Sequence, residues 1–173
     1  ILLESKKPIH AETTGLVSIR FSQALEVYAR PSLLTEVQQA YCELLTEDGT
    51  PEFTIRQEST NDYFYVNRKG QRTNITEVLR RQTSDDAFDI ILYSTGKRFF
   101  GSYQAIIHVQ LTRESEESTR YTASVYAYPE NRISRFFARS MNLVERYFKK
   151  KTAHLTEIIT TISCSLCAQT DEA

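Results

Sequence analysis

The sequence predicts an α+β fold: one strand and one helix, then several antiparallel strands, then a long C-terminal helix. Two patterns carry this prediction. The middle of the chain alternates apolar and polar residues with period two, which is typical of half-buried strands. From residue 133 onward an apolar stripe recurs at helical spacing, with no Gly or Pro to interrupt it. At 173 residues, 40% hydrophobic and 25% charged, the chain has the size and composition of one globular domain.

The N-terminal region is expected to be a polar linker over residues 1–15, followed by a strand over residues 15–29. In that second stretch one face is apolar, and its members are Val17, Ile19, Phe21, Leu25 and Val27. The period then changes. After Pro31 the apolar residues recur every three or four positions, which predicts an amphipathic helix over residues 33–45 with Ser32 as a candidate N-cap.

Antiparallel strands are expected through the middle of the chain. They are placed at residues 53–55, 63–66, 88–94, 103–111 and 121–128. Gly70 supplies a hairpin turn between the second of these and residues 73–81, a stretch that fits either a strand or one or two helical turns. The domain is expected to span residues 16–163, with a tail over residues 164–173.

The final helix is predicted to be unusually long. Running to about residue 163, it would measure about 48 Å at about 1.5 Å per residue, longer than the roughly 40 Å diameter of a domain of this size. It must therefore bend or overhang the domain. The β-branched cluster over residues 158–162 weakens helical propensity, which favours fraying or a partner contact at that end.

This order of elements resembles the helix-grip domains of the START-like superfamily, which includes lipid-transfer and polyketide-cyclase-related proteins. The likeness spans about residues 16–163 and depends on the passage from strand 121–128 through Pro129-Glu130-Asn131 into the last helix. The resemblance implies a curved antiparallel sheet that grips the long helix, with an apolar cavity between them. Members of the superfamily commonly bind lipids, sterols or other hydrophobic ligands, and some use pocket residues for chemistry.

Polar residues on the predicted strands are candidates for the wall of such a cavity. His108 lies between Gln104 and Gln110 on one face of its strand, where it would bind a polar group or act as a general base, or simply face solvent. Tyrosines suit a pocket that holds an amphipathic molecule, although aromatic residues are enriched in strands generally. The pocket candidates are Tyr93, Tyr103, Gln104, His108, Gln110, Tyr126 and Tyr128.

Charge is distributed unevenly along the chain. Residues 131–151 hold seven basic residues and one acidic residue, Glu145, a local charge of +6 in a chain whose total is −1. The basic residues are Arg132, Arg135, Arg139, Arg146, Lys149, Lys150 and Lys151. Such a helix face either contacts an anionic membrane or is the solvated back of a core helix. A second basic and aromatic group, Lys97, Arg98, Phe99 and Phe100, is expected in or beside a loop between two strands. There it gates a pocket mouth, touches a membrane, or forms an ordinary turn with Phe99 or Phe100 in the core.

Other chemistries lack the residues they need. Cys164 and Cys167 form a C-x-x-C at the end of a helical pattern rather than at its start, and the three histidines show no metal-ligand spacing with them, so no metal or cofactor is expected. No catalytic-triad or phosphate-loop pattern is present, and nucleic-acid binding is disfavoured. The first reading is therefore a non-catalytic domain that binds a lipid-like molecule, with peripheral membrane contact. The alternatives are an assembly protein with a filled core that dimerises through its last helix, and an enzyme that uses His108.

Overall fold

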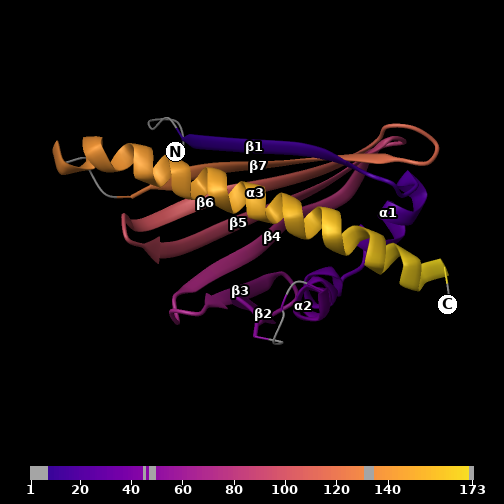
Figure 1. Ribbon diagram of the computed structural model, residues 1–173, viewed down its shortest axis with the longest axis horizontal. Coiled ribbons are helices and arrows are strands. Elements are labelled where there is room, and N and C mark those ends of the chain that lie inside the picture. Colours follow the sequence, from indigo (N-terminus) through magenta and orange to yellow (C-terminus); the bar gives the residue numbers. More distant parts are fainter. Residues whose placement is uncertain (1–7, 45, 47–49, 131–134, 172–173) are drawn as a thin grey trace.

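The computed structural model describes residues 8–44, 46, 50–130 and 135–171, and for residues 135–141 and 170–171 it describes the backbone alone. Within these residues the strands and helices follow one another as Figure 1 shows. Their bounds are β1 (Ile9–Val17), α1 (Phe21–Tyr28), α2 (Leu33–Leu44), β2 (Phe53–Gln57), β3 (Asp62–Asn67), β4 (Arg72–Ser84), β5 (Ala87–Arg98), β6 (Gly101–Arg113), β7 (Thr119–Pro129) and α3 (Arg135–Asp171).

The strands form one seven-stranded antiparallel sheet in the order β1-β7-β6-β5-β4-β3-β2. The sheet is curved, and α3 runs diagonally across one of its faces, with α1 and α2 beside the C-terminal half of α3 (Figure 1). We call the face covered by α3 the inner face and the opposite one the outer face. The predicted α+β fold, a curved antiparallel sheet gripping a long C-terminal helix, is confirmed.

The core consists of two groups of packed side chains at opposite ends of the inner face. The helix cluster joins α1, α2 and the end of α3 to the sheet, through residues such as Val27, Tyr41 and Ile162. The hairpin cluster joins the β5–β6 hairpin to residues 144–148 of α3, through residues such as Phe100, Val144 and Phe148. Apolar packing therefore closes both ends of the space between the sheet and α3.

The N-terminal prediction needs two corrections. Residues 9–15 are not a linker but most of β1, in which Ile9 and Ala11 are buried and the strand pairs with β7. Residues 21–28 are not strand but helix α1. Its buried residues, Phe21, Ala24, Val27 and Tyr28, follow helical spacing, and in so short a stretch a period of two and a period of 3.6 select several of the same positions.

The C-terminal prediction also needs correction. Residues 164–171 continue α3 instead of forming a tail, and Ile158, Ile162, Leu166 and Cys167 are buried in the helix cluster. Burial against α1 and α2 outweighs the weak helical propensity of the β-branched residues, because packing of an apolar face contributes more to a helix than propensity does. One face of this end of α3 is therefore buried within the chain, while Thr160, Thr161 and Cys164 on its other side are exposed. A homodimer contact through the last helix stays a prediction.

Candidate functional site

The most unusual side chain in the described part of the chain is Arg98, at the end of β5. It belongs to the same strand face as Phe88, Ile90 and Leu92, so its guanidinium points inward, and only 7% of the residue is exposed. Charged side chains are almost never buried this deeply unless an opposite charge accompanies them. Arg98 therefore sets the chemistry of its surroundings.

Four elements besides β5 supply the neighbours of this guanidinium. Its Nε donates to the hydroxyl of Tyr147 on α3 at 2.9 Å, and its Nη1 donates to the Lys97 carbonyl at 2.7 Å. Its Nη2 donates to the hydroxyl of Tyr65 on β3 at 2.9 Å and to that of Thr73 on β4 at 2.6 Å. The ring of Tyr103, on β6, lies 5.9 Å from the guanidinium carbon. We call Arg98, Tyr65, Thr73, Tyr103 and Tyr147 the arginine cluster.

The partners in the arginine cluster carry no charge that could balance Arg98. Burial raises the pKa of Tyr103 well above its ordinary value, and burial also raises the pKa of Tyr147, so both hydroxyls stay protonated at neutral pH. Burial acts to lower the pKa of Arg98, but the surrounding tyrosine hydroxyls outweigh it and leave that pKa above its ordinary value. Among the described residues no carboxylate lies within ion-pairing distance of this guanidinium. The cluster is a positive site lined by neutral donors and acceptors.

Two glycines let the arginine cluster form. A Cβ at Gly96 would lie 3.0 Å from both the Thr73 Oγ1 and the Tyr103 Oη, so only a residue without a side chain leaves these hydroxyls undisturbed. Gly101 has a φ of +98°, which favours glycine and allows β5 to turn into β6 through two residues. In that turn Phe100 is buried in the hairpin cluster while Phe99 is 65% exposed.

A surface hollow opens beside the cluster. It has a volume of about 330 Å³ and is lined by Gln71, Arg72, Lys97, Arg98 and Phe99, which come from the β3–β4 and β5–β6 hairpins. Arg72 shares its charge with Glu58 at 2.7 Å and stacks on the Phe64 ring at 4.0 Å. Three cationic side chains thus surround one small hollow. The basic and aromatic group predicted from sequence does not lie on one side of the chain. Arg98 and Phe100 point inward, whereas Lys97 and Phe99 remain exposed.

Most of the predicted pocket residues lie on the wrong face for a cavity under α3. Tyr103 is on the inner face, in the hairpin cluster. Side chains alternate along a strand, so Gln104, His108 and Gln110 project from the outer face of β6. Their cross-strand neighbours share that face, which places three tyrosines there as well: Tyr93, Tyr126 and Tyr128. Because the inner face of β6 is the one that packs against α3, six of the seven candidates cannot line a cavity under the helix.

His108 has a carboxylate partner, but on that outer face. Its Nε2 lies 2.6 Å from Oδ1 of Asp89, which also accepts a hydrogen bond from Gln110 at 3.0 Å, and Thr83 donates to the other carboxylate oxygen. Burial raises the pKa of Asp89, but these hydrogen bonds outweigh it and leave the pKa below its ordinary value. Hydrogen bonds from its neighbours thus keep the Asp89 carboxylate ionised. The residue lies on the outer face, away from α3.

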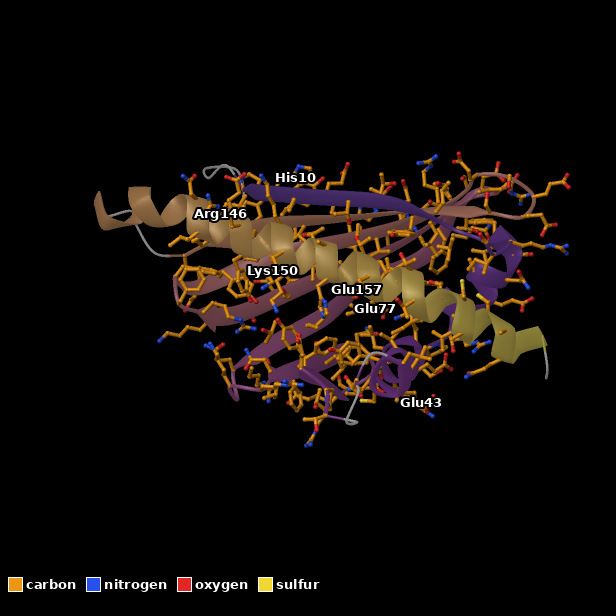
Figure 2. All side chains as sticks on the ribbon, in the orientation of Figure 1. His10, Glu43, Glu77, Arg146, Lys150 and Glu157 are labelled. Carbon is orange, nitrogen blue, oxygen red and sulfur yellow. The ribbon has the colours of Figure 1, made fainter. Side chains whose placement is uncertain are left out.

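The basic face of α3 is only partly described. Arg132 lies outside the described residues, as do the side chains of Arg135 and Arg139. Arg146 and Lys150 are exposed along the N-terminal half of α3 (Figure 2). Lys149 pairs with Glu145 at 2.8 Å, and the ammonium of Lys151 lies 5.7 Å from the Tyr147 ring. The described part of this face is therefore cationic but partly neutralised.

The three cysteines all lie in the described residues. Cys42, Cys164 and Cys167 are free thiols there, and no three His, Cys, Asp or Glu side chains of the described chain gather as a metal site would require. None of the helices in the described ranges has the length and apolar character needed to cross a bilayer.

Sequence reasoning named Arg98 but missed its partners Tyr65, Thr73 and Tyr147. One signal was available for Arg98 itself, because it continues the inward-facing alternation of Phe88, Ile90 and Leu92. Its partners are 25, 33 and 49 residues away in sequence. No local pattern connects such residues, and only the strand order brings them together.

The fold has well-defined relatives among solved structures. No protein-family model matches the sequence, and no curated protein matches it either. A norcoclaurine synthase point mutant from Thalictrum flavum is similar with a TM-score of 0.60 at 12% identity, covering 90% of this chain and 94% of that one. Ara h 8.0201 is similar with a TM-score of 0.55 at 10% identity, covering 90% and 97%.

These likenesses extend over nearly the whole chain on both sides, so the protein has a helix-grip fold. The resemblance to the START-like superfamily is confirmed as a likeness of fold. A conserved protein from Geobacillus kaustophilus, with a TM-score of 0.51 at 10% identity over 92% of this chain and 95% of that one, has the same architecture. At such identities a shared fold does not carry an activity across, so function must be argued from the site.

Proposed function

We propose that this domain binds a small amphipathic molecule of the lipid class against the inner face of its sheet, beneath α3. One observation carries the proposal. Between the two packed clusters, the apolar inner-face residues Leu92, Ile107 and Leu155 are only partly buried. In a filled core such residues would be closed off from water, because interiors are close-packed. The accessible stretch gives an apolar ligand body surface to cover, worth roughly 25 cal/mol per Å².

The comparisons support the proposal at a general level. A norcoclaurine synthase from Thalictrum flavum with the same fold was solved in complex with dopamine and hydroxybenzaldehyde, two small aromatic molecules. The arginine cluster adds polar groups on the same face of the sheet, with Arg98 six residues beyond Leu92 on β5 and Tyr103 four residues before Ile107 on β6, and an amphipathic ligand requires such groups. His108, the candidate for catalysis, lies on the outer face and has no part in the proposed site.

Native mass spectrometry of the protein purified from its own host, followed by lipid extraction, tests the proposal. We expect a near-stoichiometric bound lipid-class molecule. The neighbouring residues Ile106 and Ile107 provide a matched pair, since both are partly buried but project from opposite faces of β6. Ile107→Phe should displace the bound molecule by filling the site, whereas Ile106→Phe should retain it. A dimer mass with nothing bound would instead support the assembly function.

The same proposal includes contact with an anionic membrane. Phe99 is exposed at the hairpin tip, and its ring lies 6.0 Å from that of Tyr147 on α3, so the tip adjoins the basic face. Leu143 is exposed on the same half of α3. Each basic residue near such a membrane contributes about 1 kcal/mol. Replacing Arg146, Lys150 and Lys151 by Gln should abolish sedimentation with phosphatidylserine vesicles. Unchanged sedimentation would contradict the membrane contact.

A further inference from the structure

Arg98 is the only described cation that combines deep burial with a lack of any carboxylate partner and a place on a hollow. The other deeply buried arginine, Arg80, has a countercharge, because its Nη2 pairs with Glu77. The guanidinium of Arg98 is held by hydroxyls and one carbonyl, and these neutral groups orient the charge without cancelling it. A buried charge of this kind is costly until an opposite charge approaches it.

The hydrogen bonds of Arg98 also leave donor capacity. A guanidinium has five N–H donors. Nε uses one on Tyr147, Nη2 uses two on Tyr65 and Thr73, and Nη1 uses one on the Lys97 carbonyl. One Nη1 donor therefore remains without a partner among the described residues. Arg98 is itself one of the residues that line the hollow, so a ligand there lies close to this side chain.

The rest of the hollow favours the same ligand chemistry. Lys97 and Arg72 place two more cationic side chains at its edge, of which Arg72 is paired with Glu58, and Gln71 adds an amide. Anions bind best where charged donors are held in place before the ligand arrives. The tyrosine and threonine hydroxyls fix the guanidinium plane. Burial raises the pKa of Tyr103 and of Tyr147, which keeps these two side chains from becoming competing anions.

We infer that Arg98 binds an anionic group, a carboxylate or a phosphate, at the polar end of the amphipathic ligand. The inference rests on the proposed function and specifies its ligand class. The apolar part of the ligand covers the inner face at Leu92 and Ile107, and its anionic group lies at the hollow between the two hairpins. Lys97 and Arg72 attract that group, and Arg98 discriminates it from a neutral one.

Isothermal titration calorimetry with matched ten-carbon probes tests this inference. Decanoate and 1-decanol share one apolar chain and differ in charge. Wild-type protein should bind decanoate at least about tenfold more tightly than 1-decanol, since hydrogen bonds to charged groups are the strong ones. Arg98→Gln should weaken decanoate binding about 10- to 100-fold and leave 1-decanol binding within about threefold of wild type.

A matched control removes the same charge elsewhere. Arg113 is exposed at the far end of β6, where it pairs with Asp86 at 2.7 Å. Arg113→Gln should leave the preference for decanoate intact. If circular dichroism shows that Arg98→Gln does not fold, Arg98→Lys replaces it as the test variant. Lysine keeps the charge but lacks the planar guanidinium, so this variant should retain only part of the preference for decanoate over 1-decanol. The wild-type comparison of the two probes needs no variant at all.

The outcomes separate the inference from the proposed function. Equal binding of both probes by the wild type would overturn the anionic group and leave the amphipathic ligand standing. An unchanged decanoate affinity in Arg98→Gln would overturn the role of Arg98. Binding of neither probe would overturn the proposed function. Inorganic phosphate and decyl phosphate distinguish the source of the anion. If inorganic phosphate binds as tightly as decyl phosphate, and Arg98→Gln abolishes both, the site holds a free anion and the amphipathic ligand is overturned.

Discussion

Strand β5 buries one acidic and one basic side chain, Asp89 and Arg98, and the protein treats the two charges differently. Because they are nine residues apart, an odd separation, they project from opposite faces of the sheet. They are 6% and 7% exposed. Asp89 has His108 as a potential cationic partner and two neutral donors in Gln110 and Thr83. Arg98 has neutral partners alone among the described residues.

This difference distinguishes a charged group that stabilises the fold, Asp89, from one that remains available to bind a ligand, Arg98. Hydrogen bonds to its carboxylate lower the pKa of Asp89 despite its burial, so the folded chain stabilises that ion. Arg98 is oriented but not neutralised, which is the arrangement expected of a binding group. Burial alone does not separate the two residues. The charge and hydrogen-bonding character of their partners does.

Truncating Asp89 should have the largest effect on stability. Asp89→Ala removes the acceptor of three side chains and should lower the free energy of unfolding by about 3 kcal/mol, measured by urea denaturation. Asp89→Asn keeps the shape and one acceptor oxygen and should cost clearly less. A loss below about 1 kcal/mol for Asp89→Ala would mean that the outer-face network does not stabilise the fold.

The stability supplied by Asp89 should also depend on pH in a defined direction. Its folded pKa lies below its unfolded value, so its contribution is present above about pH 4 and is lost as the pH falls through the folded pKa. The stability difference between wild type and Asp89→Asn should therefore narrow between pH 5 and pH 2. A difference that stays constant or widens over that range would contradict the lowered pKa.

Arg98→Met should change stability much less than Asp89→Ala does. The substitution loses four hydrogen bonds but also removes the cost of burying an unbalanced charge. We expect a change of no more than about 1 kcal/mol in the ligand-free protein, measured by the same urea denaturation. If Arg98→Met instead unfolds the protein as readily as Asp89→Ala, Arg98 is a structural residue and the contrast between the two charges fails.

The sequence predicted elements well where the periodicity was long. The strands of β5, β6 and β7 and the helix α3 each follow an alternation or a stripe over many residues, and all were found in place. Residues 21–28 were misassigned because eight residues fit both periods. Residues 9–15 were missed as strand because only Ile9 and Ala11 mark the inward face of β1 as apolar. The next inward positions are Thr13 and Gly15, which do not continue an apolar alternation.

The site was less predictable for a different physical reason. A strand pattern separates two faces but does not say which face meets the helix, so His108 and Gln110 were assigned to the pocket when they belong to the outer face. The choice between faces depends on burial. Tyr103, Ala105 and Val109 are all buried, which identifies their face of β6 as the inner one only once the structure is known. The arginine cluster depends on contacts between five elements, which no single stretch of sequence contains.

Gly96→Ala should have the smallest effect, and it tests how precisely the arginine cluster must be arranged. The added methyl group would lie 3.0 Å from Thr73 Oγ1 and Tyr103 Oη, so these hydroxyls must shift by a few tenths of an ångström. Because the Thr73 hydroxyl accepts a hydrogen bond from Arg98 and shares another with the Tyr103 hydroxyl, the shift should tilt the guanidinium and weaken decanoate binding about fivefold, equivalent to about 1 kcal/mol. Gly15→Ala is the control, since its methyl group would meet the ring of Tyr121, outside the arginine cluster. It should lower stability by about 1–3 kcal/mol through overpacking and leave the preference for decanoate over 1-decanol unchanged. If the two variants weaken decanoate binding equally, affinity follows global stability, and the hydroxyls around Arg98 do not position it for the ligand.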